Sequence, residues 1–239
     1  MISVVILAGG TGSRLKSALP KQFIQINDLP IIAHTLRNFE TNPQIDNIVI
    51  VCLKDWIEYT KNIVENHHFT KVRGIVEGGE TGHASTRNGV FSLRDYLSDD
   101  DYVIIHDAAR PIVPQDVIDD LIEVAKKNGN ACSSISCYET LLLTEDRLSG
   151  KEQIDRSRII RCQTPQCYRF GLIRSLYEQA EKDNRDDFVY ANTMAINYGV
   201  EIFFSKGSNN NIKITTKEDV VFFKALLHYL ETIEVEDYQ

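Results

Sequence analysis

A glycine-rich, basic loop follows the first apolar segment of the chain and could do phosphate chemistry. Residues 8–14 read AGGTGSR, Lys16 and Lys21 come next, and the first acidic residue is Asp28. Glycines let backbone N–H groups approach phosphate oxygens closely, and nearby cations balance the charge of a triphosphate. The spacing is not a dinucleotide-binding fingerprint, because its third glycine would be Leu15, and no G-K-[ST] of a Walker A loop follows. We predict phosphate binding here, against the alternative of a flexible loop with solvated charges.

A single carboxylate stands at the end of a later apolar segment. Residues 102–106 read YVIIH, which is typical of a buried strand, and Asp107 follows at once. Ligands of open α/β sheets bind at the carboxyl ends of the strands. One Asp at that edge suits Mg²⁺, which keeps several waters and takes one or two protein ligands plus phosphate oxygens. A cap or turn residue is an equally good interpretation of Asp107, and we assign no role to His106.

Two further segments could complete a nucleotide site. Residues 78–87 read GGETGHASTR, a glycine-rich turn that enters a helix, so free N–H groups would lie at the positive end of the helix dipole. Ser85 could there bind a base or ribose, although a plain loop and cap explain the segment equally well. Lys213 is expected on a short strand just before Thr216 and Asp219, which fit a capping box of the last helix. Taken alone, Lys213 is best interpreted as a surface lysine.

Composition restricts the class of protein. The chain has 239 residues, 43% hydrophobic content and a net charge of -8, which suits one large α/β domain or two small ones. This charge argues against non-specific nucleic-acid binding and against an anionic membrane surface as partners. The N-terminal MISVVILAGG is too short for a signal peptide or a membrane span, so we expect a cytoplasmic protein. The five cysteines form no metal-ligand pairs, and most of them are expected in the core, in a reducing compartment.

The glycine loop and the carboxylate must be positioned by alternating strands and helices. Strands are expected at residues 2–7, 45–52, 72–76, 102–106, 131–136 and 200–204, and helices at 31–39, 56–65, 83–97, 117–127, 171–182, 187–198 and 217–230. This alternation predicts an α/β fold with a mostly parallel twisted sheet and helices on both faces. Residues 137–161 are polar, with a turn at 148–150, and are expected to form a protruding β-arm of one domain, 1–239.

Seven segments in this order resemble one family of nucleotidyltransferases. It contains 2-C-methyl-D-erythritol 4-phosphate cytidylyltransferase and ribitol-5-phosphate cytidylyltransferase. The matching segments are LAGGTGSR (7–14), PKQF (20–23), the glycine loop up to Ser85, HDAARP (106–111), Asp155-Arg156, QTPQ (163–166) and NIKITT (211–216). They span nearly the whole chain, and seven in order are far more specific than any one. The resemblance implies a three-layer, Rossmann-like nucleotidyltransferase fold that transfers CMP from CTP to a polyol phosphate.

The resemblance assigns a role to each matching residue. Catalytic roles fall to Arg14, Lys21, Arg156 and Lys213. CTP binding falls to Leu7, Ala8, Gly9, Gly10, Gly79, Glu80, Ser85 and Asp107, with Asp107 also holding Mg²⁺ or another divalent cation. Acceptor binding falls to Arg110, Thr140, Arg156, Thr164 and Lys213. The family is typically a homodimer in which each arm reaches into the partner's site, so Arg156 would serve the neighbouring subunit.

The identity of the acceptor is less well defined by the sequence. Gly82 stands where the family commonly has an Arg, and residues 189–193 lack a common Thr-Asp pair, although Asp186 and Asp187 lie just upstream. LAGGTGSR resembles the ribitol-type enzymes, whereas HDAARP is closer to the methylerythritol type. We expect D-ribitol 5-phosphate, giving CDP-ribitol for cell-wall or capsule polymers, with the methylerythritol enzyme of isoprenoid biosynthesis as the alternative.

Three other classes are possible. A sugar-1-phosphate nucleotidylyltransferase would share the loop and sheet, but QTPQ and NIKITT favour the cytidylyl family. A non-catalytic nucleotide-binding protein is disfavoured because Arg14, Lys21 and Asp107 are all present. A dinucleotide oxidoreductase is disfavoured by Leu15 and by the basic loop.

Overall fold

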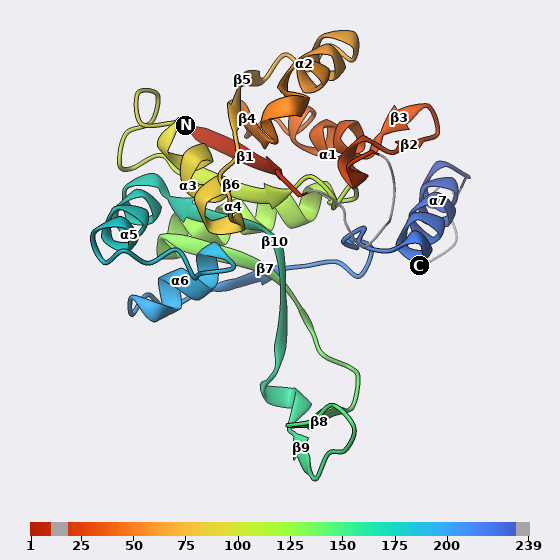
Figure 1. Cartoon of the computed structure of the whole chain (residues 1–239), viewed down its shortest axis with the longest axis vertical. Coiled ribbons are helices and arrows are strands. Elements are labelled where there is room, and N and C mark those ends of the chain that lie inside the picture. The colour runs from red at the N-terminus through yellow and green to blue at the C-terminus, as the bar shows by residue number, and fades with distance from the viewer. Residues whose placement is uncertain (11–18, 233–239) are drawn as a thin grey trace.

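The computed structural model describes residues 1–10 and 19–232, and its centre is a seven-stranded sheet (Figure 1). The strands are β1 (Ile2–Ala8), β4 (Asn47–Cys52), β5 (Val72–Glu77), β6 (Tyr102–Asp107), β7 (Asn130–Ser136), β10 (Ile160–Arg169) and β11 (Phe204–Lys206). Their order across the sheet is β11-β7-β10-β6-β1-β4-β5. All neighbours are parallel except β10, which is antiparallel to both β6 and β7. The predicted mostly parallel sheet is confirmed.

Helices cover both faces of the sheet, because the strands are apolar on both sides. One face packs against α1 (Ile31–Glu40), α2 (Ile57–Asn66) and α4 (Gln115–Asn128), the other against α3 (Gly82–Phe91), α5 (Phe170–Lys182) and α6 (Ala191–Asn197). Within β1, Val4 and Ile6 point into the first core and Val5 into the second. The three layers follow from this alternation. The last helix, α7 (Lys217–Thr232), buries Phe223 in a third, smaller core with Ile31 and Ile214.

Residues 137–159 form the arm, which extends away from the lower edge of the sheet in Figure 1. Within it β8 (Leu141–Leu143) pairs antiparallel with β9 (Glu152–Ile154), and a 3-10 turn at Arg156–Arg158 leads back into β10. Asp146 closes the loop between the two strands by accepting the N–H groups of Leu148 and Ser149 at 2.8 and 2.9 Å. The protruding hairpin is as expected, but it ends before residue 160, where β10 begins.

The structure corrects several sequence expectations. β10 was not predicted at all. The last strand is β11 at Phe204–Lys206 instead of 200–204, α3 ends at Phe91, and α6 begins only at Ala191. The short strand expected at Lys213 is wrong, since residues 211–215 belong to no helix or strand. The capping box is confirmed, because Asp219 Oδ2 accepts the N–H of Thr216 and Thr216 Oγ1 accepts that of Asp219.

Short 3-10 turns and strands complete the fold. A 3-10 turn at Lys21–Phe23 is followed by the hairpin of β2 (Gln25–Ile26) and β3 (Leu29–Pro30), which leads directly into α1. Another 3-10 turn, Lys54–Trp56, precedes α2.

Among the described residues, none of the helices combines the length and the apolar character needed to span a bilayer.

Candidate active site

A cavity of about 330 Å³ opens at the carboxyl ends of β1 and β6. This is the edge of an open α/β sheet where ligands bind. Residues from seven parts of the chain line it: the end of β1, the turn after residue 20, the N-terminus of α3, the end of β6, β10, and the segments before α6 and α7. The lining includes Leu7, Gly9, Gly10, Lys21, Gly79, Glu80, Ser85, Asp107, Thr164 and Lys213.

One wall of the cavity is made of backbone. Ser85 Oγ accepts the N–H of Gly79 at 3.1 Å, and a Cβ on Gly79 would lie 2.4 Å from Cβ of Ala84, so no side chain fits there. Thr81 caps α3 by accepting the N–H of Ala84 at 3.0 Å. The N-terminus of this helix therefore faces the cavity with a glycine turn in front of it. Such an arrangement favours an anionic or hydrogen-bonding ligand.

The opposite side of the glycine loop is held by the residues of the PKQ turn. Gln22 Nε2 donates to the carbonyl oxygens of Ala8 and Gly10, at 2.6 and 3.1 Å. Its neighbour Lys21 lines the cavity and donates from Nζ to the carbonyl oxygen of Ile214 at 2.8 Å. Gln22 thus fixes the loop, and Lys21 places a positive charge between the loop and the residues before α7.

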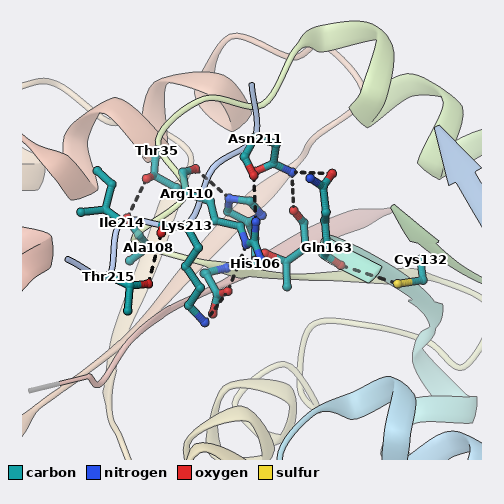
Figure 2. Close-up of polar contacts among 12 residues, drawn as sticks. Thr35, His106, Ala108, Arg110, Cys132, Gln163, Asn211, Lys213, Ile214 and Thr215 are labelled. Atoms are coloured by element: carbon teal, nitrogen blue, oxygen red, sulfur yellow. Dashed lines mark hydrogen bonds and ion pairs between the residues drawn. The ribbon is translucent and has the colours of Figure 1, made fainter. Parts of the chain in front are cut away.

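Asp107 lies between two cations, Lys213 and Arg110, both of which are labelled in Figure 2. Its Oδ2 lies 2.9 Å from Lys213 Nζ and 3.3 Å from Arg110 Nε. Burial by itself would raise the pKa of the Asp107 carboxyl, but the positive charges of Lys213 and Arg110 outweigh this and hold the pKa below its ordinary value. Asp107 is therefore ionised at neutral pH and is suited to hold a cation.

His106 has a structural place beneath this site. It is fully buried, its Nε2 pairs with the carbonyl oxygen of Arg110 at 3.0 Å, and its ring stands edge-on to Phe39. Burial lowers the pKa of His106 to about 4. The imidazole is therefore neutral at physiological pH, and we assign it no catalytic role.

The strand missed by the sequence analysis contributes a third side. Thr164 Oγ1 accepts the N–H of Asp107 at 3.2 Å, and Gln166 of the same strand also lines the cavity. The rim is completed by Val189 and Tyr190, which are 67% and 52% exposed. Sequence reasoning did not assign Gln22, Gln166, Val189 or Tyr190 to the site. The PKQF and QTPQ matches were the available signal for the two glutamines.

The structure brings most of the predicted site residues together but not all. Ala8 is buried directly behind the loop, and Arg110 reaches the cavity only through Asp107. Arg156 and Thr140 lie exposed on the arm and are not among the residues that line the cavity, and Arg156 Nη1 donates to the carbonyl oxygen of Tyr138 at 2.7 Å. Arg14 lies outside the described residues.

A divalent cation would have few protein ligands here. Among residues 1–10 and 19–232, no group of three or more His, Cys, Asp or Glu side chains could enclose a metal ion. Asp107 and Glu80 are the acidic residues that line the cavity, and the carboxylate of Asp107 fits Mg²⁺, whose remaining positions would be taken by waters and phosphate oxygens.

The fold and this cavity define the class of nucleotidyltransferases, and comparisons with known proteins narrow the class. Residues 2–229 match the model of the family described as IspD, 2-C-methyl-D-erythritol 4-phosphate cytidylyltransferase. The chain therefore belongs to this cytidylyltransferase family.

Relatives and solved structures agree with this membership. The chain is 36% identical to a ribitol-5-phosphate cytidylyltransferase of Lacticaseibacillus paracasei, over 97% of this chain and 100% of that protein. It is 37% identical to a 2-C-methyl-D-erythritol 4-phosphate cytidylyltransferase of Clostridium botulinum, over 95% and 98%. The crystal structure of 2-C-methyl-D-erythritol 4-phosphate cytidylyltransferase from Francisella tularensis has a TM-score of 0.79 and 29% identity, covering 94% of this chain and 98% of that one.

Proposed function

We propose that this protein transfers CMP from CTP to D-ribitol 5-phosphate and releases pyrophosphate. The carrying observation is the convergence, in one cavity, of a glycine-built wall, the ionised Asp107 and the cations Lys21 and Lys213. That inventory suits a triphosphate on one side and an acceptor phosphate on the other. D-ribitol 5-phosphate is favoured as the acceptor because relatives of this chain from Lacticaseibacillus paracasei and Streptococcus agalactiae are ribitol-5-phosphate cytidylyltransferases.

The proposed reaction needs positioning and charge neutralisation more than acid–base chemistry. A phosphate oxygen of the acceptor attacks the α-phosphorus of CTP in line, the bond to the β-phosphate oxygen breaks, and pyrophosphate leaves with its electron pair. Because the attacking phosphate is already ionised at neutral pH, no general base is required. Two lysines would lie beside the reacting phosphates. Lys21 lies beside the glycine loop, where the triphosphate would bind, and Lys213 lies beside Asp107.

The residues of this chain divide the remaining work. The backbone of Gly9, Gly10 and Gly79, with Ser85, would orient the nucleotide. Bound Mg²⁺, held by Asp107, would supply neutralisation of the phosphate charge. Arg14 would stabilise the same charge from the first loop. Arg110 pairs with Asp107 in the described structure, so its proposed acceptor contact would form beside that ion pair.

We further propose that the enzyme works as a cytoplasmic homodimer. Arg156 and Thr140, to which the family resemblance gives acceptor roles, lie on the arm and away from the residues that line this chain's cavity. An arm that reaches a second copy would bring them to a site. The exposed Leu142, Leu143 and Leu148 of the arm are the kind of side chains that such an interface would cover.

Pyrophosphate release tests the proposed function. The purified chain is incubated with CTP, Mg²⁺ and one of D-ribitol 5-phosphate, 2-C-methyl-D-erythritol 4-phosphate or other polyol phosphates. We expect release with D-ribitol 5-phosphate and formation of CDP-ribitol, a precursor of wall or capsule polymers. Release with the methylerythritol phosphate alone would assign the chain to isoprenoid synthesis. Binding of CTP without release across the panel would favour a non-catalytic nucleotide-binding protein.

A further inference from the structure

Lys213 reaches the cavity from a segment without regular secondary structure. Residues 208–215, here the Lys213 segment, lie between β11, which ends at Lys206, and α7, which begins at Lys217. Irregular backbone of this kind has no hydrogen-bond ladder of its own to hold it in place. The 2.9 Å contact between Lys213 Nζ and Asp107 Oδ2 therefore depends on the bonds that this segment makes to the sheet.

The ends of the Lys213 segment are tied down by ordinary contacts. Gln163 Nε2 donates to the carbonyl oxygen of Ser208 at 2.8 Å, and the N–H of Ser208 donates back to Gln163 Oε1 at 3.2 Å. At the other end, the N–H of Ile214 donates to the carbonyl oxygen of Ala109 at 2.8 Å. These bonds hold residues 208 and 214, and in the middle the N–H of Asn211 donates to the carbonyl oxygen of Ser208 at 3.1 Å, a local bond that does not join the middle to the sheet.

Asn211 holds the middle of the segment. It is 1% exposed, and its Nδ2 donates to the carbonyl oxygen of Thr164 at 2.7 Å and to Gln163 Oε1 at 3.4 Å. Its backbone carbonyl oxygen accepts from Arg110 Nη1 at 2.8 Å. Figure 2 shows Asn211 directly above Arg110 and beside Gln163, with these contacts drawn. Its side chain thus joins the segment to β10, two residues before Lys213.

Two of the partners of Asn211, Thr164 and Arg110, are also partners of Asp107. Thr164 Oγ1 accepts the N–H of Asp107, and Arg110 Nε pairs with the carboxylate of Asp107. The contact from Lys213 to Asp107 closes this ring of bonds. Because buried polar networks of this kind fix one arrangement of their members, a change at Asn211 is transmitted to the distance between Lys213 and Asp107.

We propose that Asn211 is a positioning residue for this reaction: its buried side-chain amide sets where Lys213 meets the acceptor phosphate. The inference rests on the proposed function, in which Lys213 binds that phosphate. Asn211 itself is not among the residues that line the cavity, so it acts through Lys213 and not by touching either substrate.

Two substitutions at Asn211 and one matched control test the proposal. Asn211→Ala removes both side-chain donors, and Asn211→Leu removes them while keeping the volume, so that a fold lost through a cavity is distinguished from a lost contact. We expect either variant to raise the KM of the acceptor about tenfold, with the KM of CTP changed by less than about twofold. Asn210→Ala, at an exposed asparagine next along the chain, should leave both constants unchanged.

A double-mutant cycle separates positioning from a general structural role. If Asn211 acts through Lys213, Asn211→Leu in a Lys213→Ala background should add little to the rise in acceptor KM caused by Lys213→Ala alone. The same fold-change in both backgrounds would overturn the proposal, as would an unchanged acceptor KM in the single Asn211 variants. An unchanged acceptor KM in Lys213→Ala would instead remove Lys213 from the proposed function, and the role of Asn211 with it.

Discussion

The cavity and the arm differ in how their functional side chains are held. In the cavity, Asp107 is paired with the nearby Arg110 and with Lys213, and its N–H is bonded to Thr164, so two of its three partners come from distant parts of the chain. On the arm, Arg156 is exposed and bonded to the backbone of Tyr138, within the same hairpin. Long-range bonds fix the first group before any ligand arrives. The second group has only local support, so its place in a reaction depends on what the arm meets.

This difference divides the proposed reaction into two parts. The groups that would hold CTP and orient its phosphates are preorganised in one chain, which lowers the cost of reaching the transition state. The arm would supply acceptor contacts only in a dimer. We therefore expect substitutions in the cavity to act on turnover within each chain, and substitutions on the arm to act between chains.

Loss of Lys21 should have the largest effect. Lys21→Ala removes a cation beside the glycine loop, where charge develops as pyrophosphate leaves, so we expect turnover to fall by about a thousandfold or more. Because its bond is to a backbone oxygen near the surface of the cavity, the fold should persist, as judged by circular dichroism and by thermal unfolding. Lys54→Ala, at an exposed lysine outside the cavity, is the control. Near-normal turnover in Lys21→Ala would remove Lys21 from the mechanism.

The arm should act on the acceptor alone. Arg156→Ala should raise the KM of the polyol phosphate about tenfold or more, with a smaller change for CTP, because the nucleotide wall contains no arm residue. Steady-state kinetics with each substrate varied in turn measure the split. Equal changes in both constants would contradict the division between cavity and arm.

Mixing two variants, assayed at an acceptor concentration at which each alone has little activity, asks whose site the arm serves. If each arm completes the partner's cavity, half of the dimers formed at random from Arg156→Ala and Lys213→Ala chains contain one chain of each kind. Each of these mixed dimers has one intact site. We expect such a mixture to recover about a quarter of the wild-type activity. If the arm serves its own chain, no intact site forms and no activity returns on mixing. Exchange of subunits is checked with differently tagged chains.

Much of the cavity wall was predictable because it is encoded locally. Continuous apolar runs define β1 and β6, and the rule that ligands bind at the carboxyl ends of strands places the glycine loop and Asp107 side by side. The pairing is seen in the register, where Leu7 lies opposite Asp107. The three layers follow from the same alternation of strands and helices.

The elements that were missed depend on distant partners. β10 carries Gln163, Pro165 and Gln166, which interrupt an apolar pattern, and Gln163 finds its partner far along the chain, since its Nε2 donates to the carbonyl oxygen of Ser208. A short strand was expected at Lys213, yet this segment is held by the bonds of Asn211 to Thr164 and to Arg110, which lie 47 and 101 residues away in the sequence. No local spacing of residues reports such bonds.

The core behind the cavity and the arm should also differ in how tightly they are packed around a glycine, and this prediction has the smallest expected effect. A Cβ on Gly89 of α3 would lie 2.4 Å from Val5 Cγ1 and 2.7 Å from Val51 Cγ2, in the core directly behind the cavity. On the arm, a Cβ on Gly150 would lie 3.1 Å from the carbonyl oxygen of Leu143, where a small shift relieves the contact. Neither glycine has a positive φ, so the comparison isolates space from backbone strain.

We expect Gly89→Ala to lower the free energy of unfolding by about 1–3 kcal/mol, because the sheet cannot move away from the added methyl group. Part of that cost is offset by the better helix propensity of alanine, worth about 1 kcal/mol. Gly150→Ala should change the same quantity by less than about 0.5 kcal/mol. Urea unfolding followed by circular dichroism measures both. Equal losses of unfolding free energy would mean that the arm is packed as tightly as the core. The arm would then not be a locally held segment that a partner must complete.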